Sequence, residues 1–377
     1  MRILFYFAWP VDTLGGAELA TQNLAEGLLR HGHDVGMIEM LRDSPSASLL
    51  TRTFGGPVWS LQADSSGQSA RSWAVVFGQF RSIEAKFDPD ILSVQCPSWQ
   101  AAPVIGASTL PHRWRLAVAL HGTEMLQDAG NPRLRPWLNR LFSAAAAITV
   151  VSESLRRDFN ARYPMVAHKA RVIHNGIEPG WASSAEAPRI APHVRYVLYA
   201  GRFDRIKGID ILLRAWKKVE ACQRELWLAG AGAEEDGLRA LARDLGLGGQ
   251  VRFVGLVAQS DLPALYRNAE LVVIPSRHEG LPRVALEAGA CGAVCVATRV
   301  GGVAEVISDP DTGFLVAPES PEALADGLVR ALRLTSEDRR RVGAAARNRI
   351  LQQFTHARTV ADYEQLFRSL LEPAVRP

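Results

Sequence analysis

The sequence is poor in cysteine. It has four among 377 residues, with no C-x-x-C pair and no histidine spacing that completes a zinc set: Cys96, Cys222, Cys291 and Cys295. This pattern excludes a disulfide framework or a zinc ribbon as the basis of the fold. We expect the four residues to be small core side chains in a reducing compartment.

The sequence also lacks a long apolar run. Its best stretch, residues 144–151, is much shorter than the roughly 20 residues that a membrane-spanning helix needs. The opening MRILFYFAW leads directly into a strand pattern and carries no small-residue cleavage site. We therefore expect a cytoplasmic protein.

Charge of one sign is not concentrated in either half of the sequence. The net charge is +4, but residues 1–180 hold 17 Lys and Arg against 15 Asp and Glu, so neither half is a basic domain. A nucleic-acid partner is not expected, because such proteins gather cations on one face or in one domain.

What is present is a repeated alternation of short apolar runs and amphipathic stretches. We predict strands and helices over these ranges: strands 2–8, 90–94, 115–120, 147–151, 196–200, 225–229, 251–254, 271–274 and 293–297; helices 17–30, 73–87, 321–333, 336–352 and 356–371. Residues 44–67, rich in Ser, Gly and Thr, predict an irregular surface excursion.

Two successive βα-rich halves predict an α/β protein with two doubly wound, Rossmann-like domains that face one another across a cleft. The Pro, Ala and Ser-rich residues 178–193 have the composition of a linker. We expect an amino-terminal domain over 1–180, a second domain over 195–355, and a final helical segment over 356–377.

Several strands end in residues suited to ligand binding, which in such sheets takes place at the carboxyl edge. Gly15-Gly16 lies between the first strand and helix, where the glycines could equally serve only a tight turn. His121 follows the strand 115–120, and a purely structural role for it is as plausible as a functional one. Arg202 and Lys207 follow the strand 196–200, and two cations there suit a diphosphate that gains charge as it leaves.

The stretch after strand 271–274 holds two glutamates, Glu279 and Glu287, eight positions apart. Pro282 fits the first position of a helix, which puts Glu279 in a loop and Glu287 within the helix. The free N–H groups at that helix start suit a phosphate, and the carboxylates suit sugar hydroxyls. The residues around this start are candidates for donor binding: Gly280, Leu281, Arg283 and Val284.

These motifs together resemble the family 4 retaining glycosyltransferases of the GT-B fold (glycosyl transferases group 1). The E-x7-E pair reads EGLPRVALE, follows LVVIPS and precedes VATRVGGVAEVI, and G-R-x4-K stands roughly eighty residues earlier. GGAE, HG at His121 and VIHNGIE also match family segments, although Gly122-Thr123 replaces the commoner aspartate. The resemblance implies that the last helix crosses back onto the amino-terminal, acceptor-side domain.

The resemblance also implies a reaction, in which a hexose moves from a nucleotide-sugar to an acceptor hydroxyl with retention of configuration. Arg202 and Lys207 would bind the diphosphate, Glu279 the sugar and Glu287 the ribose, with His121 beside the sugar. By family frequency the donor is a UDP-sugar, and the acceptor a sugar, glycolipid or polyprenyl-linked glycan of cell-surface polysaccharide or glycolipid synthesis. We expect no cofactor and no metal, because two cations and a helix end already meet the phosphates.

Retaining glycosidases hold two carboxylates about 5 Å apart, one of them a nucleophile. A loop and helix between Glu279 and Glu287 do not supply that geometry, which favours a front-face transfer in which the leaving phosphate helps to deprotonate the acceptor. Three alternatives stay open: a nucleotide-sugar epimerase, a catalytically silent sugar-nucleotide-binding protein, and a dehydrogenase. The last is weakened because Glu235 stands where a G-x-G-x-x-G motif from Gly230 needs its third glycine.

Two clusters mix arginine with tryptophan, HRWR at 112–115 and RLRPWLNR at 133–140. They fit a solvated surface with tryptophan packed beneath arginine stems, or a peripheral membrane contact through Arg133, Arg135 and Arg140. Within the helix 73–87, the stripe formed by Trp73, Phe77 and their neighbours predicts a face packed on the core.

Overall fold

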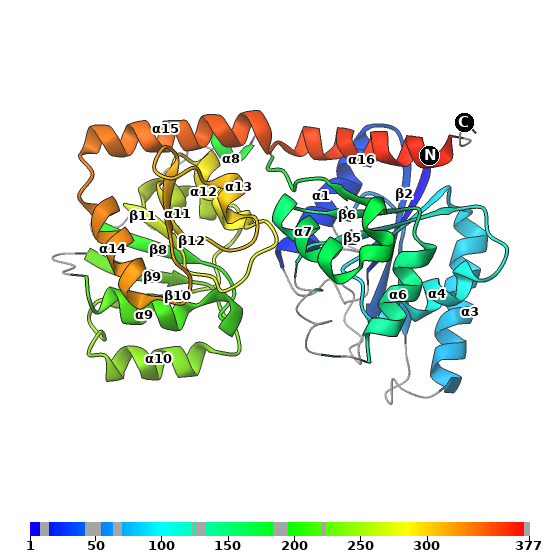
Figure 1. Ribbon diagram of the computed structural model, residues 1–377, viewed down its shortest axis with the longest axis horizontal. Coiled ribbons are helices and arrows are strands. Elements are labelled where there is room, and N and C mark those ends of the chain that lie inside the picture. The colour runs from blue at the N-terminus through cyan, green and yellow to red at the C-terminus, as the bar shows by residue number, and fades with distance from the viewer. Residues whose placement is uncertain are drawn as a thin grey trace. The chain divides into compact units, whose positions relative to one another are not determined.

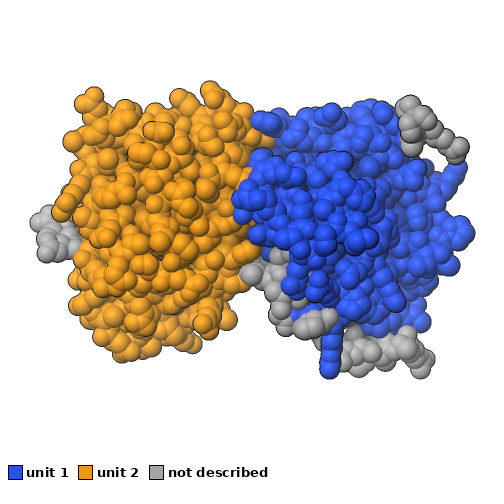
Figure 2. All heavy atoms as spheres, in the orientation of Figure 1, with its two compact units in different colours: residues 1–175, 356–377 blue, residues 176–355 orange. Residues whose placement is uncertain are grey.

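The computed structural model describes residues 1–7, 15–41, 54–62, 70–122, 124, 131, 133–178, 180–183, 195–219 and 224–372. The chain divides into two compact units (Figure 2). Unit 1 comprises Met1–Asn175 and His356–Pro377, and unit 2 comprises Gly176–Thr355.

Unit 1 contains a seven-stranded parallel sheet in the order β3-β2-β1-β4-β5-β6-β7. Its strands are β1 (Arg2–Phe7), β2 (Asp34–Leu41), β3 (Val58–Gln62), β4 (Ile91–Gln95), β5 (Arg115–Leu120), β6 (Ala147–Val150) and β7 (Ala170–Val172). Its longer helices are α1 (Gly16–Arg30), α3 (Ala70–Phe87), α4 (Ala102–Ser108), α6 (Arg135–Ala144), α7 (Glu153–Arg162) and α16 (His356–Leu371).

Helices cover both faces of this sheet because the central strand is apolar on both sides. Phe5 on one face of β1 lies in a core cluster with Leu28 of α1 and Phe367 of α16. On the other face Tyr6 meets Phe80 of α3 edge to face, with ring centroids 5.9 Å apart. Successive residues of a strand point to opposite faces, so one buried run supplies two cores.

The carboxyl-terminal helix α16 packs on α1 within unit 1 (Figure 1). Close approach requires a glycine in α1, because a Cβ on Gly27 would lie 2.4 Å from Cγ2 of Val360. The hydroxyl groups of Tyr363 and Thr149 are hydrogen-bonded at 2.9 Å. These contacts explain why 356–372 clusters with the first part of the chain although the sequence of unit 2 separates them.

Unit 2 contains a six-stranded parallel sheet in the order β10-β9-β8-β11-β12-β13. Its strands are β8 (Arg195–Ala200), β9 (Arg224–Ala229), β10 (Val251–Gly255), β11 (Leu271–Ile274), β12 (Cys295–Thr298) and β13 (Gly313–Val316). The helices include α9 (Ile209–Trp216), α10 (Glu235–Asp244), α11 (Leu262–Asn268), α12 (Arg283–Ala290), α14 (Pro321–Leu332) and α15 (Ser336–Gln353). Val197 and Tyr199 of β8 join residues of α9, α10 and α14 in one core cluster.

The α/β class with two Rossmann-like parallel sheets is confirmed. Strands 115–120 and 271–274 and helix 356–371 have the predicted bounds. The prediction of an irregular excursion over 44–67 was wrong for Val58–Gln62, which pairs with β2 as the edge strand β3, whereas residues 44–53 and 63–67 lie outside the described residues. Within the described ranges, no helix has both the length and the apolar character that crossing a bilayer requires.

Candidate active site

The order of the unit 2 sheet reverses between β8 and β11, which are neighbours although two strands separate them in sequence. The helices that follow these two strands therefore lie on opposite faces of the sheet, and the two loops at the strand ends diverge there. In open α/β sheets this point forms the crevice where ligands bind. Arg202 and Lys207 follow β8, and Glu279 follows β11, so the topology brings three predicted site residues to one place.

The two loops are joined by a bidentate ion pair. Arg277, after β11, donates from Nη1 and Nη2 to Oδ1 and Oδ2 of Asp210, at 2.8 Å each. These hydrogen bonds hold the pKa of Asp210 below its ordinary value. Gly208 permits the close approach of the loops, because its φ is +66° and a Cβ there would lie 2.1 Å from the carbonyl oxygen of Pro275. The segments that follow β8 and β11 are thus held together at the switch point.

At its centre Lys207 and Glu279 are in direct contact. Nζ of Lys207 donates to Oε1 of Glu279 at 2.7 Å, and Oγ of Ser276 donates to the same oxygen at 2.7 Å. The side chains are 24% and 11% exposed, so a ligand can still reach them. An ammonium group has three N–H donors and a carboxylate two oxygens. The other two N–H donors of Lys207 and the oxygen Oε2 of Glu279 have no hydrogen-bond partner among the described residues.

Arg202 lies at the open side of this loop. Its side chain is 55% exposed and 3.4 Å from Asp204, while its carbonyl group accepts a hydrogen bond from the hydroxyl of Tyr199. Asp204 also caps the short 3₁₀ turn η3 (Arg205–Lys207) by accepting from the backbone N–H of Lys207 at 3.2 Å. The backbone of Arg202 is therefore fixed, whereas its guanidinium group, which forms an ion pair with Asp204, is exposed and has further N–H donors for an anion.

The helix α12 begins one residue later than the sequence predicts. Pro282 is the N-cap, with an extended ψ of 110°, and Arg283 is the first helical residue. No side chain caps this start, so the N–H groups of Arg283 and Val284 face away from the helix without a capping group. Leu281 is buried beneath the turn, and Gly280 accepts from the N–H of Gly302 at 3.0 Å.

Glu287 is buried within α12 and already has two partners. Nε of Arg283 donates to its Oε1 at 2.8 Å, and the hydroxyl of Tyr266 donates to its Oε2 at 3.0 Å. Burial raises the pKa of Glu287, and the positive charge of Arg283 opposes that rise. Nη1 of Arg283 is buried and lacks a partner among the described residues, although most buried donors have one.

His121, at the carboxyl end of β5 in unit 1, belongs to a separate network. Its Nε2 lies 3.1 Å from Oε1 of Gln95, and burial lowers the pKa of its ring. The carboxylate of Glu124 accepts from the backbone N–H groups of His121 and Gly122. The structure therefore places the carboxylate of Glu124 beside this histidine, but the carboxylate is hydrogen-bonded to backbone N–H groups and not to the imidazole ring. Gly15 is the N-cap of α1 and Gly16 its exposed first residue.

Within the described ranges, no three acidic, histidine or cysteine side chains gather into a group that could hold a metal. Two Asp-Pro-Asp triplets, 88–90 and 309–311, each precede a strand. Asp90 accepts a hydrogen bond from the backbone N–H of Arg2 at the start of β1, so the first triplet lies at the amino edge of its sheet. Asp309 of the second triplet lies 3.8 Å from Arg299.

Sequence reasoning missed three partners of the predicted residues. Ser276 could have been found as the polar residue just after β11, and Arg283 as an i,i+4 partner of Glu287. Tyr266 could not, because its contact with Glu287 depends on how α11 packs against α12.

Comparison with known proteins shows the family of the chain. Residues 184–349 match the profile of the family described as glycosyl transferases group 1, and residues 14–181 match glycosyltransferase family 4. An uncharacterized glycosyltransferase of Methanocaldococcus jannaschii is 31% identical over 350 residues, 86% of this chain and 87% of that protein. The N-acetyl-alpha-D-glucosaminyl L-malate synthase of Bacillus anthracis is 26% identical over 268 residues, 69% of each chain.

Solved structures show the same fold. Sucrose-phosphate synthase from Thermosynechococcus elongatus superposes with a TM-score of 0.83 and 23% identity, over 98% of this chain and 99% of that one. Anabaena HepE, solved in complex with UDP and glucose, gives a TM-score of 0.83 and 21% identity, over 98% of this chain and 100% of that one.

Proposed function

We propose that this chain, which belongs to the family 4, group 1 glycosyltransferases, transfers a hexose from a nucleotide-sugar to an acceptor hydroxyl with retention of anomeric configuration. The observation that carries the proposal is the contact of Lys207 with Glu279 at the β8/β11 switch point. A UDP-sugar is the donor that we favour, since the similar fold of HepE was solved with UDP and glucose.

The diphosphate is assigned to the positively charged side of the crevice. Lys207 offers two N–H donors beyond the one that Glu279 accepts, and Arg202 offers an exposed guanidinium fork. The uncapped start of α12, from Gly280 to Val284, adds backbone donors and a positive dipole end. These groups stabilise the charge that develops on the leaving diphosphate as the glycosidic bond breaks.

The two glutamates are assigned to hydroxyl groups. Oε2 of Glu279 accepts from the donor sugar while Oε1 stays on Lys207 and Ser276. Glu287 accepts from the ribose, because each of its oxygens can take one hydrogen bond beyond those of Arg283 and Tyr266. Neither carboxylate acts as a nucleophile, and the leaving phosphate receives the acceptor proton. For His121 and Gly15-Gly16 we propose the roles that the family resemblance implies. His121 contacts the donor sugar, and Gly15-Gly16 contacts the donor phosphates.

The test is an assay of nucleotide release from a panel of UDP-, GDP- and ADP-sugars, with and without candidate acceptors. We expect release from one donor class and a product whose anomeric proton coupling in NMR matches that of the donor. An inverted product would contradict the retaining mechanism. An epimerised nucleotide-sugar, donor binding without turnover, or nicotinamide binding would instead support the three alternatives.

The proposal includes turnover without a metal, because it assigns the phosphates to the cationic side chains and the uncapped start of α12. Activity in EDTA should equal activity in Mg²⁺. Loss of turnover in EDTA, restored by Mg²⁺ or Mn²⁺, would remove this part of the proposal.

The proposed acceptor is a sugar, glycolipid or polyprenyl-linked glycan of cell-surface polysaccharide or glycolipid synthesis. A peripheral contact with an anionic bilayer would bring the protein to such an acceptor. Sedimentation with anionic vesicles should weaken when Arg133, Arg135 and Arg140 are reversed to glutamate, and absent or unchanged sedimentation would reject that contact.

A further inference from the structure

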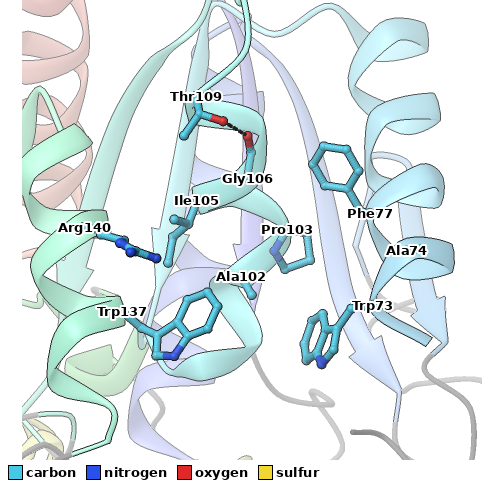
Figure 3. Close-up of a pocket in the computed structure, with 10 residues that line it drawn as sticks. All are labelled: Trp73, Ala74, Phe77, Ala102, Pro103, Ile105, Gly106, Thr109, Trp137 and Arg140. Atoms are coloured by element: carbon cyan, nitrogen blue, oxygen red, sulfur yellow. Dashed lines mark hydrogen bonds between the residues drawn. The ribbon is translucent and has the colours of Figure 1, made fainter. Parts of the chain in front are cut away.

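Unit 1 has an open apolar groove on the outer side of the helices α3, α4 and α6 (Figure 3). Its volume is about 640 Å³, which lies in the range of small-molecule sites. Trp73 and Phe77 of α3 form one wall, and Trp137 of α6 lies on the opposite side and is 40% exposed. Ile105 of α4 lies between them.

The prediction of a core face for the stripe of α3 is therefore only partly right. Val76 and Phe80 are fully buried in the core, whereas Trp73 and Phe77 are half-buried and line the groove. Of the two Arg-Trp clusters, 112–115 has its tryptophan buried. Trp114 donates from Nε1 to Oε1 of Glu84 at 2.6 Å.

The charge around the groove is one-sided. Arg140 lines it, is exposed, and has no ion-pair partner among the described residues. The sequences of α3, α4 and α6 contain a single acidic residue, Glu84, which is buried and bonded to Trp114 and Arg81. Among the described residues that line the groove, Arg140 is the only charged side chain. A cation beside an apolar channel matches an amphiphile whose hydrocarbon part ends in an anionic group.

The groove also has a direction. α3, α4 and α6 each follow a strand of a parallel sheet, so each begins at the carboxyl edge. Trp73, Ala102 and Trp137 lie near those helix starts, and Thr109 marks the other end of the groove (Figure 3). A chain lying in the groove therefore has one end at the sheet edge where reactions of this fold take place.

We propose that this groove binds a single hydrocarbon chain of an amphiphilic acceptor, with its anionic head group against Arg140, one turn along α6 from Trp137. The identification of the ligand as the acceptor rests on the proposed transfer reaction, whereas the binding itself does not. This site makes the acceptor a lipid-linked molecule, which the motifs of the donor site leave undecided.

The probe is dodecyl phosphate, titrated calorimetrically into the full-length protein below its critical micelle concentration. We expect saturable one-to-one binding. Removing two methylenes, as in decyl phosphate, should weaken binding on the order of tenfold, because each buried methylene contributes about fourfold. Inorganic phosphate should bind far more weakly than either amphiphile.

Matched variants place the binding in the groove. Ala74→Glu puts a carboxylate on an exposed, groove-lining position of α3 and should weaken binding at least about tenfold. Val75→Glu is the control, because Val75 is 52% exposed and does not line the groove. Arg140→Gln should weaken dodecyl phosphate several-fold but leave dodecyl maltoside unchanged. Arg157→Gln, at an exposed position of α7, should change neither.

Equal weakening by Ala74→Glu and Val75→Glu would overturn the proposal. So would the absence of saturable binding by monomeric amphiphile in the wild-type protein, including the case in which only anionic vesicles bind. Donor binding is measured in the same preparations with a nucleotide-sugar. If the protein binds the amphiphile but no nucleotide-sugar, the donor site is refuted and the groove stands. If it binds a nucleotide-sugar but no amphiphile, the groove is refuted and the donor site stands.

Discussion

The substitution Arg283→Leu tests the buried network of α12 most sharply. The side chains of Arg283 and Glu287 are only 12% and 7% exposed, and their 2.8 Å ion pair is the main electrostatic support of the Glu287 carboxylate. Removing one partner of a buried pair leaves an uncompensated charge and costs about 3–5 kcal/mol. For a unit of this size each kcal/mol lowers Tm by roughly 2–4 °C, so we expect a fall on the order of 10 °C at pH 8.

The effect should depend on pH with a defined sign. Burial raises the pKa of Glu287 above its ordinary 4.5, so the folded state holds that proton more tightly than the unfolded state. Stability therefore falls as the pH rises from about 4.5 through the raised pKa. Arg283→Leu raises that pKa further, and the loss of stability should be steeper and extend to higher pH. Glu287→Gln, which cannot ionise, should abolish this part of the pH dependence.

The assay is thermal unfolding followed by circular dichroism between pH 4.5 and 8.5. Arg341→Leu is the control, because it removes an exposed i,i+3 partner of Asp338 and should leave Tm nearly unchanged. A Tm for Arg283→Leu equal to that of the wild type at pH 8, with the same pH slope, would refute the reasoning.

Three further predictions follow from named contacts. Gly301→Ala places a Cβ 1.7 Å from the carbonyl oxygen of Glu279, at a residue whose φ is +48°. The affinity for the nucleotide-sugar, measured by calorimetry, should therefore fall. An unchanged affinity would contradict the inference that this turn supports Glu279. Tyr363→Phe leaves the buried hydroxyl of Thr149 without its α16 partner and should cost about 1 kcal/mol in urea unfolding, whereas an unchanged midpoint would show that this bond does not hold α16. The pKa of His121 is lowered by burial, so the wild type should lose stability as the pH falls below 6.5 and His121→Gln should lose less; equal pH slopes would refute a buried neutral ring.

How much the sequence predicts depends on the range of the interactions involved. The strands β5 and β11 are unbroken apolar runs, and α16 has a clear 3.6-residue period, so local pattern was sufficient. The edge strand β3 was missed because its five residues stand within a stretch rich in Ser, Gly and Thr, and such a short run forms a strand only when β2 lies beside it.

The candidate site shows the same division. Motif spacing placed Arg202, Lys207 and Glu279 after two particular strands, but their contact depends on the adjacency of β8 and β11, which sequence order does not reveal. Lys207 and Ser276 donate to the same oxygen of Glu279, and sequence alone could not predict this because Lys207 is 72 positions away from Glu279. The groove of unit 1 depends on three helices and could not be predicted from any one of them.

The central claim is that the crevice holding Lys207 and Glu279 binds the donor. A thermal-shift measurement with a nucleotide-sugar panel tests it directly, because a ligand at 100 times its Kd stabilises the native state by about 2.7 kcal/mol. We expect one nucleotide-sugar to raise the Tm of the wild type and of Lys217→Ala, an exposed control on the same unit, but not that of Lys207→Ala. A shift for Lys207→Ala equal to that of the wild type would contradict the account.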